Sequence, residues 1–90
     1  MPKSLNLKAI NKEQNKMAKS PKLSGKNLIK LLKSLGFEVV RIKGSHHILK
    51  HKDGRMTFVP VHSNEIIGPG LLNKILQDCE LTNEEFITLL

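Results

Sequence analysis

The sequence predicts a small α+β domain in which helices cover one face of a three-stranded antiparallel sheet. Three observations favour this fold. Residues 25–35 repeat apolar side chains at helical spacing. Residues 37–61 contain three β-rich runs separated by glycine-containing turns, and Pro69 opens a second apolar helical pattern. The chain has 90 residues, which is the size of one such domain.

The first helix is expected over residues 25–35, with Ser24 as the N-cap and Gly36 at the C′ position. Its apolar face is formed by Leu28, Leu31, Leu32 and Leu35. The opposite face carries a lysine stripe of Lys26, Lys30 and Lys33. Such a stripe is either a solvated face or a surface for a phosphate backbone, and the sequence leaves both interpretations open.

Three strands are expected next, over residues 37–43, 46–52 and 55–61. Gly44 and Ser45 form a tight connection between the first two, and Asp53 with Gly54 is a strong hairpin signal between the last two. Pro60 cannot donate a ladder hydrogen bond, which places the third strand at a sheet edge or close to its own end.

A two-residue turn at Asp53 and Gly54 would set the register of the second hairpin, with Leu49 facing Phe58. Period-two alternation then gives an expected core face of His47, Leu49, His51, Met56, Phe58, Pro60 and His62. His47 is expected half covered at the end of this patch, with His62 diagonal to it at about 7–8 Å. A slip of one residue would exchange the two faces.

The C-terminal third predicts a polar connection over residues 62–68 and a helix from Pro69 to about Asp78. Thr82 and Glu85 then form a capping box for a last short helix. Cys79 is the only cysteine, so an internal disulfide is excluded and a reducing compartment is expected. Because Asp78 and Glu80 flank its thiol, a structural role is expected for Cys79 rather than a nucleophilic one.

The formal net charge of +7 is concentrated in residues 1–22, which hold six lysines and one acid. These residues lack a sustained apolar period, and we expect a flexible basic extension ahead of a domain at residues 23–90. An arm that attracts RNA is the second interpretation. The chain contains neither an apolar run of membrane-spanning length nor the apolar region of a secretion signal, so a soluble cytoplasmic protein is expected.

The four histidines carry the proton chemistry expected near neutral pH. His46 and His47 are adjacent on a strand and should point to opposite faces, while His47 and His51 lie about 13 Å apart. Zinc ligands must lie about 2 Å from the metal, so no metal site is expected. Nucleotide-binding and hydrolase motifs are missing from the sequence, as are the Tyr and Trp side chains on which single-stranded RNA stacks.

His47 is the candidate catalytic residue, because Lys43 and Ser45 stand beside it in sequence. RNA cleavage needs a base for the 2′-hydroxyl proton and an acid for the leaving 5′ oxygen, and imidazole can serve either step. A lysine can hold the phosphate. The alternative role for His47 is a histidine at the core edge that only makes hydrogen bonds. Two other functions stay open: a non-catalytic RNA-binding module that uses the lysine stripe, and a protein-interaction domain.

Residues 23–90 resemble the HicA-like toxins (also called YcfA/HicA-like) of bacterial and archaeal toxin–antitoxin pairs. The segments that carry the resemblance are Ser24-Gly25-Lys26, Leu35-Gly36-Phe37, Lys43-Gly44-Ser45-His46-His47, His51-Lys52-Asp53-Gly54-Arg55, Val59-Pro60-Val61-His62 and Ile67-Gly68-Pro69-Gly70. The resemblance implies an αβββα fold like that of double-stranded-RNA-binding domains. It also implies an mRNA interferase, an endoribonuclease that needs neither metal nor other cofactor, and a HicB-like antitoxin that binds and inactivates it.

The family's catalytic histidine corresponds to His47, whereas His46 occupies a position that varies in the family. Our own inference adds RNA contacts by Lys43, Gly44, Ser45, Lys26 and Lys30. We expect a monomer alone and a hetero-oligomer with the antitoxin, with mRNA as substrate and no membrane partner. The chain departs from the family pattern at residues 78–80, where a small residue and a glycine are expected.

Overall fold

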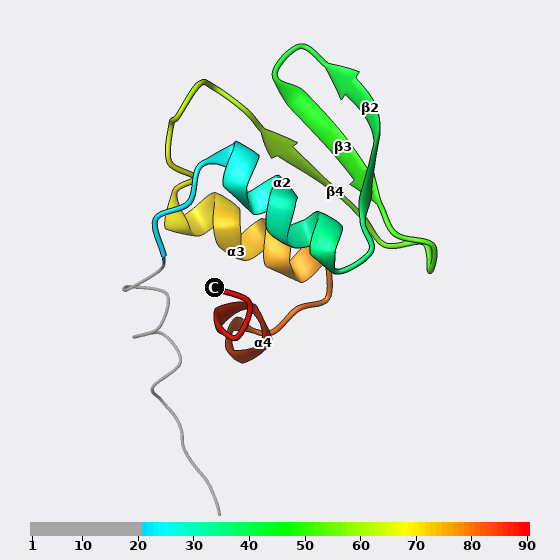
Figure 1. Ribbon diagram of the computed structural model, residues 1–90, viewed down its shortest axis with the longest axis vertical. Coiled ribbons are helices and arrows are strands. Elements are labelled where there is room, and N and C mark those ends of the chain that lie inside the picture. Colours follow the sequence, from blue (N-terminus) through cyan, green and yellow to red (C-terminus); the bar gives the residue numbers. More distant parts are fainter. Residues whose placement is uncertain (1–20) are drawn as a thin grey trace, which may run out of the picture.

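The domain is a three-stranded antiparallel sheet with helices on one face (Figure 1). A computed structural model describes residues 21–90, so nearly all of the predicted N-terminal extension lies outside the described residues. The elements are α2 (Gly25–Ser34), β2 (Glu38–Lys43), β3 (His46–Lys50), β4 (Met56–Pro60), α3 (Pro69–Asp78) and α4 (Asn83–Ile87). The predicted αβββα order, with an extra short C-terminal helix, is confirmed.

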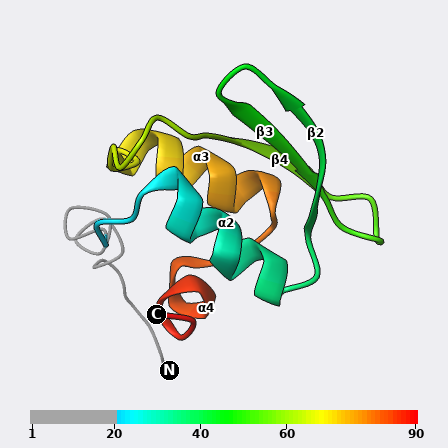
Figure 2. The same ribbon diagram turned by 45° about the horizontal axis from the view of Figure 1, so that its top comes forward.

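The helices form a layer against one face of the sheet. In both views α2 and α3 lie side by side below the strands, and α4 lies on the far side of this helical layer (Figures 1 and 2). The strand order is β2-β3-β4, so β3 is central and β4 is an edge strand. Pro60 is the last residue of β4, which agrees with the edge position predicted from its missing N–H.

The ends of α2 are set by the residues that the sequence indicated. The Ser24 hydroxyl accepts a hydrogen bond from the Asn27 N–H at 3.2 Å, as an N-cap does. Gly36 has φ +103°, and its N–H together with that of Phe37 bonds back to carbonyls of the last turn. This Schellman motif turns the chain sharply from α2 into β2.

α3 ends in the same motif with a different residue at the left-handed position. Glu80 has φ +58°, its N–H bonds to the Gln77 carbonyl, and the Leu81 N–H bonds to the Leu76 carbonyl. Glycine is the usual residue there because a Cβ is disfavoured at positive φ. The departure from the family pattern at Glu80 therefore falls on a position where the backbone favours glycine. The capping box of Thr82 then opens α4, as predicted.

Gly25 allows α2 to pack closely against the end of β4. A Cβ built on Gly25 would lie 2.2 Å from the Pro60 carbonyl oxygen and 3.2 Å from a Val61 methyl carbon. No side chain fits at that separation without a backbone shift. The first turn of α2 is thus fixed against the strand end that precedes His62.

The predicted register of the β3–β4 hairpin is wrong by one residue. Leu49 pairs with Thr57, and Ile48 with Phe58. The reason is the loop: the His51 N–H bonds to the Arg55 carbonyl and the Gly54 N–H to the His51 carbonyl, which leaves three loop residues instead of two. Gly54 takes φ +100°, as in the three-residue hairpin loops that combine a turn with a bulge.

The corrected register changes the members of the core face on β4. The side chains of β4 that point to the helices are Thr57 and Val59, both buried, whereas Met56 is 49% exposed. Phe58 and Pro60 lie on the outer face with Met56 rather than in the core. On β3 the prediction is confirmed, since Leu49 is buried on the helix side.

A β-bulge at Val40 shifts the pairing of β2 with β3. Val39 pairs with Leu49 and Arg41 with Ile48, so Val40 has no opposite residue and is 55% exposed. Beyond the bulge, Ile42 pairs with His47 and returns to the helix side of the sheet. The bulge therefore decides which β2 side chain stands beside His47.

The core lies between the sheet and the helices. Its buried apolar members are Leu28, Ile29, Leu32, Phe37, Leu49, Val59, Ile67, Leu72, Ile75, Leu76, Cys79 and Phe86. All four leucines that the sequence assigned to the apolar face of the first helix belong to this core or pack against it: Leu28 and Leu32 are fully buried, and Leu31 and Leu35 are partly buried. None of the helices within residues 21–90 is both long enough and apolar enough to cross a bilayer.

Candidate catalytic hollow

His47 lies on β3 with its side chain on the helix side of the sheet, partly exposed. Its Nδ1 is 3.3 Å from the Ser45 carbonyl oxygen. A carbonyl only accepts hydrogen bonds, so this contact favours a proton on Nδ1. The neutral ring then carries its lone pair on Nε2, which is the atom left to exchange a proton with a ligand.

A hollow of about 530 Å³ opens beside His47, between α2 and the sheet. Its lining residues come from α2, from strands β2 and β3 and from the segment after β4: Lys26, Ile29, Lys33, Val39, Ile42, His47, Val61, Ser63 and Asn64. Four of these side chains are apolar, and the others are polar or basic. A partly apolar hollow with a few convergent polar groups is the usual form of a ligand site.

The charges of this hollow favour an anionic ligand. Lys26 and Lys33 both line it, and no carboxylate is among its lining residues in the described part of the chain. The two lysines lie seven residues apart on α2, which is almost two turns of about 3.6 residues, so they project from the same side of the helix. Two ammonium groups at one rim suit a phosphate backbone.

The lysine stripe predicted from the sequence is divided by the structure. Lys26, one of the residues predicted to contact RNA, lines the hollow, and Lys33, which the predicted contacts left out, lines it as well. Lys30 is exposed on α2 but is not among the lining residues. A sequence signal for Lys33 existed, because Lys26 and Lys33 nearly coincide in direction whereas Lys30 is offset from both.

The turn between β2 and β3 places its residues differently around the hollow. Gly44 has φ +60° and open space around it. This φ fits the first central position of a type II′ turn, so the backbone conformation by itself explains why a glycine is present there. Lys43 pairs with His46 and therefore lies on the outer face, away from the side that His47 occupies. Ser45 contacts His47 through its carbonyl.

His46 and His62 have different surroundings from His47. His46 is exposed on the outer face, where its ring lies 5.2 Å from that of Phe58. His62 follows β4, is exposed, and has Nε2 3.3 Å from the Ser45 hydroxyl. The expectation of opposite faces for His46 and His47 is confirmed by the register.

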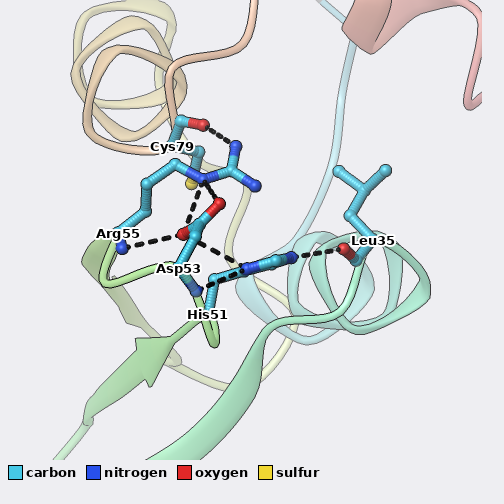
Figure 3. A network of polar contacts seen from close by, with 5 residues as sticks. All are labelled: Leu35, His51, Asp53, Arg55 and Cys79. Atoms are coloured by element: carbon cyan, nitrogen blue, oxygen red, sulfur yellow. Dashed lines mark hydrogen bonds and ion pairs between the residues drawn. The ribbon is translucent and has the colours of Figure 1, made fainter.

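The fourth histidine, His51, belongs to a polar network at the other end of the hairpin (Figure 3). Its Nε2 lies 3.1 Å from the Leu35 carbonyl, and its Nδ1 lies 3.1 Å from the Asp53 N–H. A neutral ring with the proton on Nε2 satisfies both contacts. The centre of the His51 ring lies 5.1 Å from the centre of the Phe37 ring. The His51 ring also covers Gly36, where an added Cβ would lie 2.8 Å from His51 Nε2.

Arg55 links the same network to α3. Its Nε donates to both carboxylate oxygens of Asp53, at 3.1 and 2.9 Å, and its terminal nitrogen donates to the Cys79 carbonyl at the end of α3 (Figure 3). The Arg55 guanidinium and its backbone N–H hold the pKa of Asp53 below the ordinary value. The side-chain hydrogen bond to Asp53 raises the pKa of Arg55. A cation at a helix C-terminus is also favoured by the helix dipole.

These contacts give a structural reason for residues 51–55, which carry part of the family resemblance. They join the hairpin loop to the C-terminal ends of α2 and α3. His51 is about 13 Å along β3 from His47, so the network stabilises the frame and does not enter the hollow. Sequence reasoning left this role unassigned because the partners are backbone carbonyls, which no motif reveals.

Cys79 is buried and reduced, with no accessible surface. Burial, and secondly the Asp78 carboxylate, raise the pKa of its thiol to about 11. The expected structural role therefore agrees with its surroundings, although desolvation rather than neighbouring charge is the main cause. Within residues 21–90 no three His, Cys, Asp or Glu side chains gather in a metal-binding arrangement.

The fold and the hollow define a class of protein: a small αβββα domain that holds one partly exposed histidine beside two lysines. The family model described as the HicA toxin of bacterial toxin–antitoxin matches residues 25–81. The chain belongs to this family, and the resemblance drawn from its motifs is confirmed. It is therefore a toxin of a toxin–antitoxin system, and such a system implies an antitoxin partner. The comparison with curated proteins found no match.

Proposed function

We propose that this toxin is an endoribonuclease that cuts messenger RNA and uses His47 to move a proton. One observation carries the proposal: His47 stands in an open hollow with two lysines and without a carboxylate among the lining residues that the structure describes. The 2′-hydroxyl attacks the adjacent phosphate, a bond to phosphorus forms, and the 5′ oxygen leaves. A positioned imidazole is worth about 10² to 10⁴ in the rate of such a step.

The chain's own residues account for the other requirements. The Ser45 carbonyl orients the imidazole so that Nε2 is free, and Lys26 with Lys33 offsets the charge that develops on the phosphate. The cleavage products would be a 2′,3′-cyclic phosphate and a 5′-hydroxyl. No metal ion takes part in this sequence of steps.

We further propose that the antitoxin is HicB-like and inactivates the toxin in a hetero-oligomer, as family membership favours. Since messenger RNA is the proposed substrate, the cytoplasm is the proposed place of action. We keep residues 1–22 as a proposed basic extension to the toxin domain at residues 23–90.

The test is a gel of a defined transcript incubated with the purified protein, with and without EDTA. We expect cleavage in both reactions and products with 5′-hydroxyl ends, which polynucleotide kinase labels without prior phosphatase. Binding without cleavage would favour the non-catalytic RNA-binding module instead. Loss of cleavage in EDTA, with recovery on addition of Mg²⁺, would contradict the metal-independent mechanism.

A further inference from the structure

Ser45 contacts two histidines that lie far apart in the sequence. Its carbonyl oxygen is 3.3 Å from Nδ1 of His47, and its hydroxyl oxygen is 3.3 Å from Nε2 of His62. The same carbonyl accepts the Val61 N–H at 2.8 Å, which fixes the β2–β3 turn against the end of β4. One residue thereby brings the two imidazoles to the same end of the sheet.

His62 is not among the lining residues of the hollow that contains His47, but it contacts Ser45, whose carbonyl contacts His47. The residues on either side of it, Val61 and Ser63, both line that hollow. The His62 side chain itself is exposed and borders a smaller hollow of about 260 Å³, which it shares with Glu65. A ligand that fills the first hollow and extends past Ser45 would approach His62.

RNA cleavage by internal attack needs two proton carriers, and the lining residues of the main hollow include one. The 2′-hydroxyl loses a proton while the 5′ oxygen gains one. The lysines are better suited to hold the phosphate, because an ammonium group offers three donors and gives up its proton less readily than an imidazolium.

We propose that His62 is the second catalytic residue and protonates the leaving 5′ oxygen, while His47 takes the proton of the 2′-hydroxyl. This inference rests on the proposed function. The 2′ oxygen bonds to phosphorus as its proton passes to His47 Nε2. The bond from phosphorus to the 5′ oxygen breaks as that oxygen receives a proton from the His62 imidazolium.

The contacts of Ser45 fit these two roles. Its carbonyl favours an N–H on Nδ1 of His47, which leaves the Nε2 lone pair for a base. Its hydroxyl can accept from the Nε2–H of His62 in either protonation state, so a charged ring remains bonded there. The charged residues that line the two hollows are Lys26 and Lys33 of α2, in the hollow of His47, and Glu65, in the hollow of His62.

The experiment compares two RNA substrates that differ in the leaving atom, the natural 5′ oxygen or a 5′ sulfur. A thiolate leaves without being protonated, so the sulfur substrate does not need the acid. We expect the His62→Gln protein to cleave the oxygen substrate about 10² to 10⁴-fold more slowly than the wild type does. The same variant should cleave the sulfur substrate at close to the wild-type rate. His47→Gln should be slow on both substrates, because the base is still required. His46→Gln, on the outer face, is the matched control.

A second readout is the pH dependence of single-turnover cleavage of the oxygen substrate. The wild-type rate should fall at low pH as His47 is protonated and at high pH as His62 loses its proton. His62→Gln should lose only the fall at high pH. Because His62 is exposed, its variant should unfold at the wild-type temperature, and a thermal melt checks this.

Two results would overturn this inference and leave the proposed function intact. One is a His62→Gln protein that cleaves the oxygen substrate at the wild-type rate. The other is a His62→Gln protein that is equally slow on both substrates, which would indicate a structural role for His62. A wild-type protein that cleaves neither substrate would instead refute the proposed function and this inference with it.

Discussion

Replacing Gly25 with alanine tests how closely α2 must approach β4 to form the hollow. The added Cβ would lie 2.2 Å from the Pro60 carbonyl oxygen. A normal carbon–oxygen contact is about 3.3 Å, so the helix start and the strand end must separate by about 1 Å. Overpacking of this kind costs about 1–3 kcal/mol, which lowers the melting temperature of a domain of this size by about 5–20 °C.

Gly70→Ala is the matched control for this prediction. Gly70 also lies in the first turn of a helix, but a Cβ on it would meet nothing within 4 Å. Alanine should therefore stabilise α3 by up to about 1 kcal/mol through helix propensity. Circular dichroism melts of both variants provide the assay. If Gly25→Ala melts at or above the wild-type temperature, the close approach of α2 to β4 is wrong. Because Lys26 follows Gly25, we also expect this variant to cleave RNA more slowly than its folded fraction explains.

Three further predictions concern the frame. Glu80→Gly should raise the free energy of unfolding in urea by about 1 kcal/mol, because the left-handed backbone at φ +58° destabilises a residue with a Cβ by about that amount. A destabilised variant would contradict the Schellman assignment. The Cys79 thiol, with its pKa raised to about 11, should resist iodoacetamide at pH 8 in the folded protein and react after unfolding; rapid labelling of folded protein would argue against its burial. Asp53 has a lowered pKa, so its contribution to stability should be complete above about pH 3.8 and be lost as pH falls below that value. Asp53→Asn should therefore be less sensitive to acid than the wild type, and an unchanged acid transition would contradict this.

Local chemistry predicted the helix ends well, because capping depends on neighbouring residues. Ser24, Pro69 and Thr82 each begin a helix where the sequence placed its start. Gly36 ends α2 because only the left-handed backbone allows the following residues to reach the last carbonyls. These signals are complete within four or five residues of chain.

Hairpin register could not be predicted in the same way, because it depends on one loop geometry. Asp53 with Gly54 is compatible with a two-residue or a three-residue loop, and the network of His51 and Arg55 favours the longer one. The error moved Phe58 into the predicted core and Thr57 out of it. The bulge at Val40 was equally hidden, since an unpaired strand residue has no signature in this sequence.

The side of the sheet that His47 occupies was nevertheless predicted, for a physical reason. Alternation along one strand depends only on that strand, so a buried Leu49 places His47 on the helix side whatever the register of β4. The cross-strand and helix neighbours are different. Ser63 and Asn64 reach the hollow through a loop that the sequence marks only as polar.

The most direct test of the account is the single-turnover cleavage of a defined RNA by two variants of adjacent histidines. His47 and His46 are neighbours in the chain but lie on opposite faces of the sheet. His47→Gln should reduce the rate about 10² to 10⁴-fold, with an unchanged melting temperature, and His46→Gln should keep the wild-type rate. A folded His47→Gln protein that cuts RNA as fast as the wild type would contradict the account.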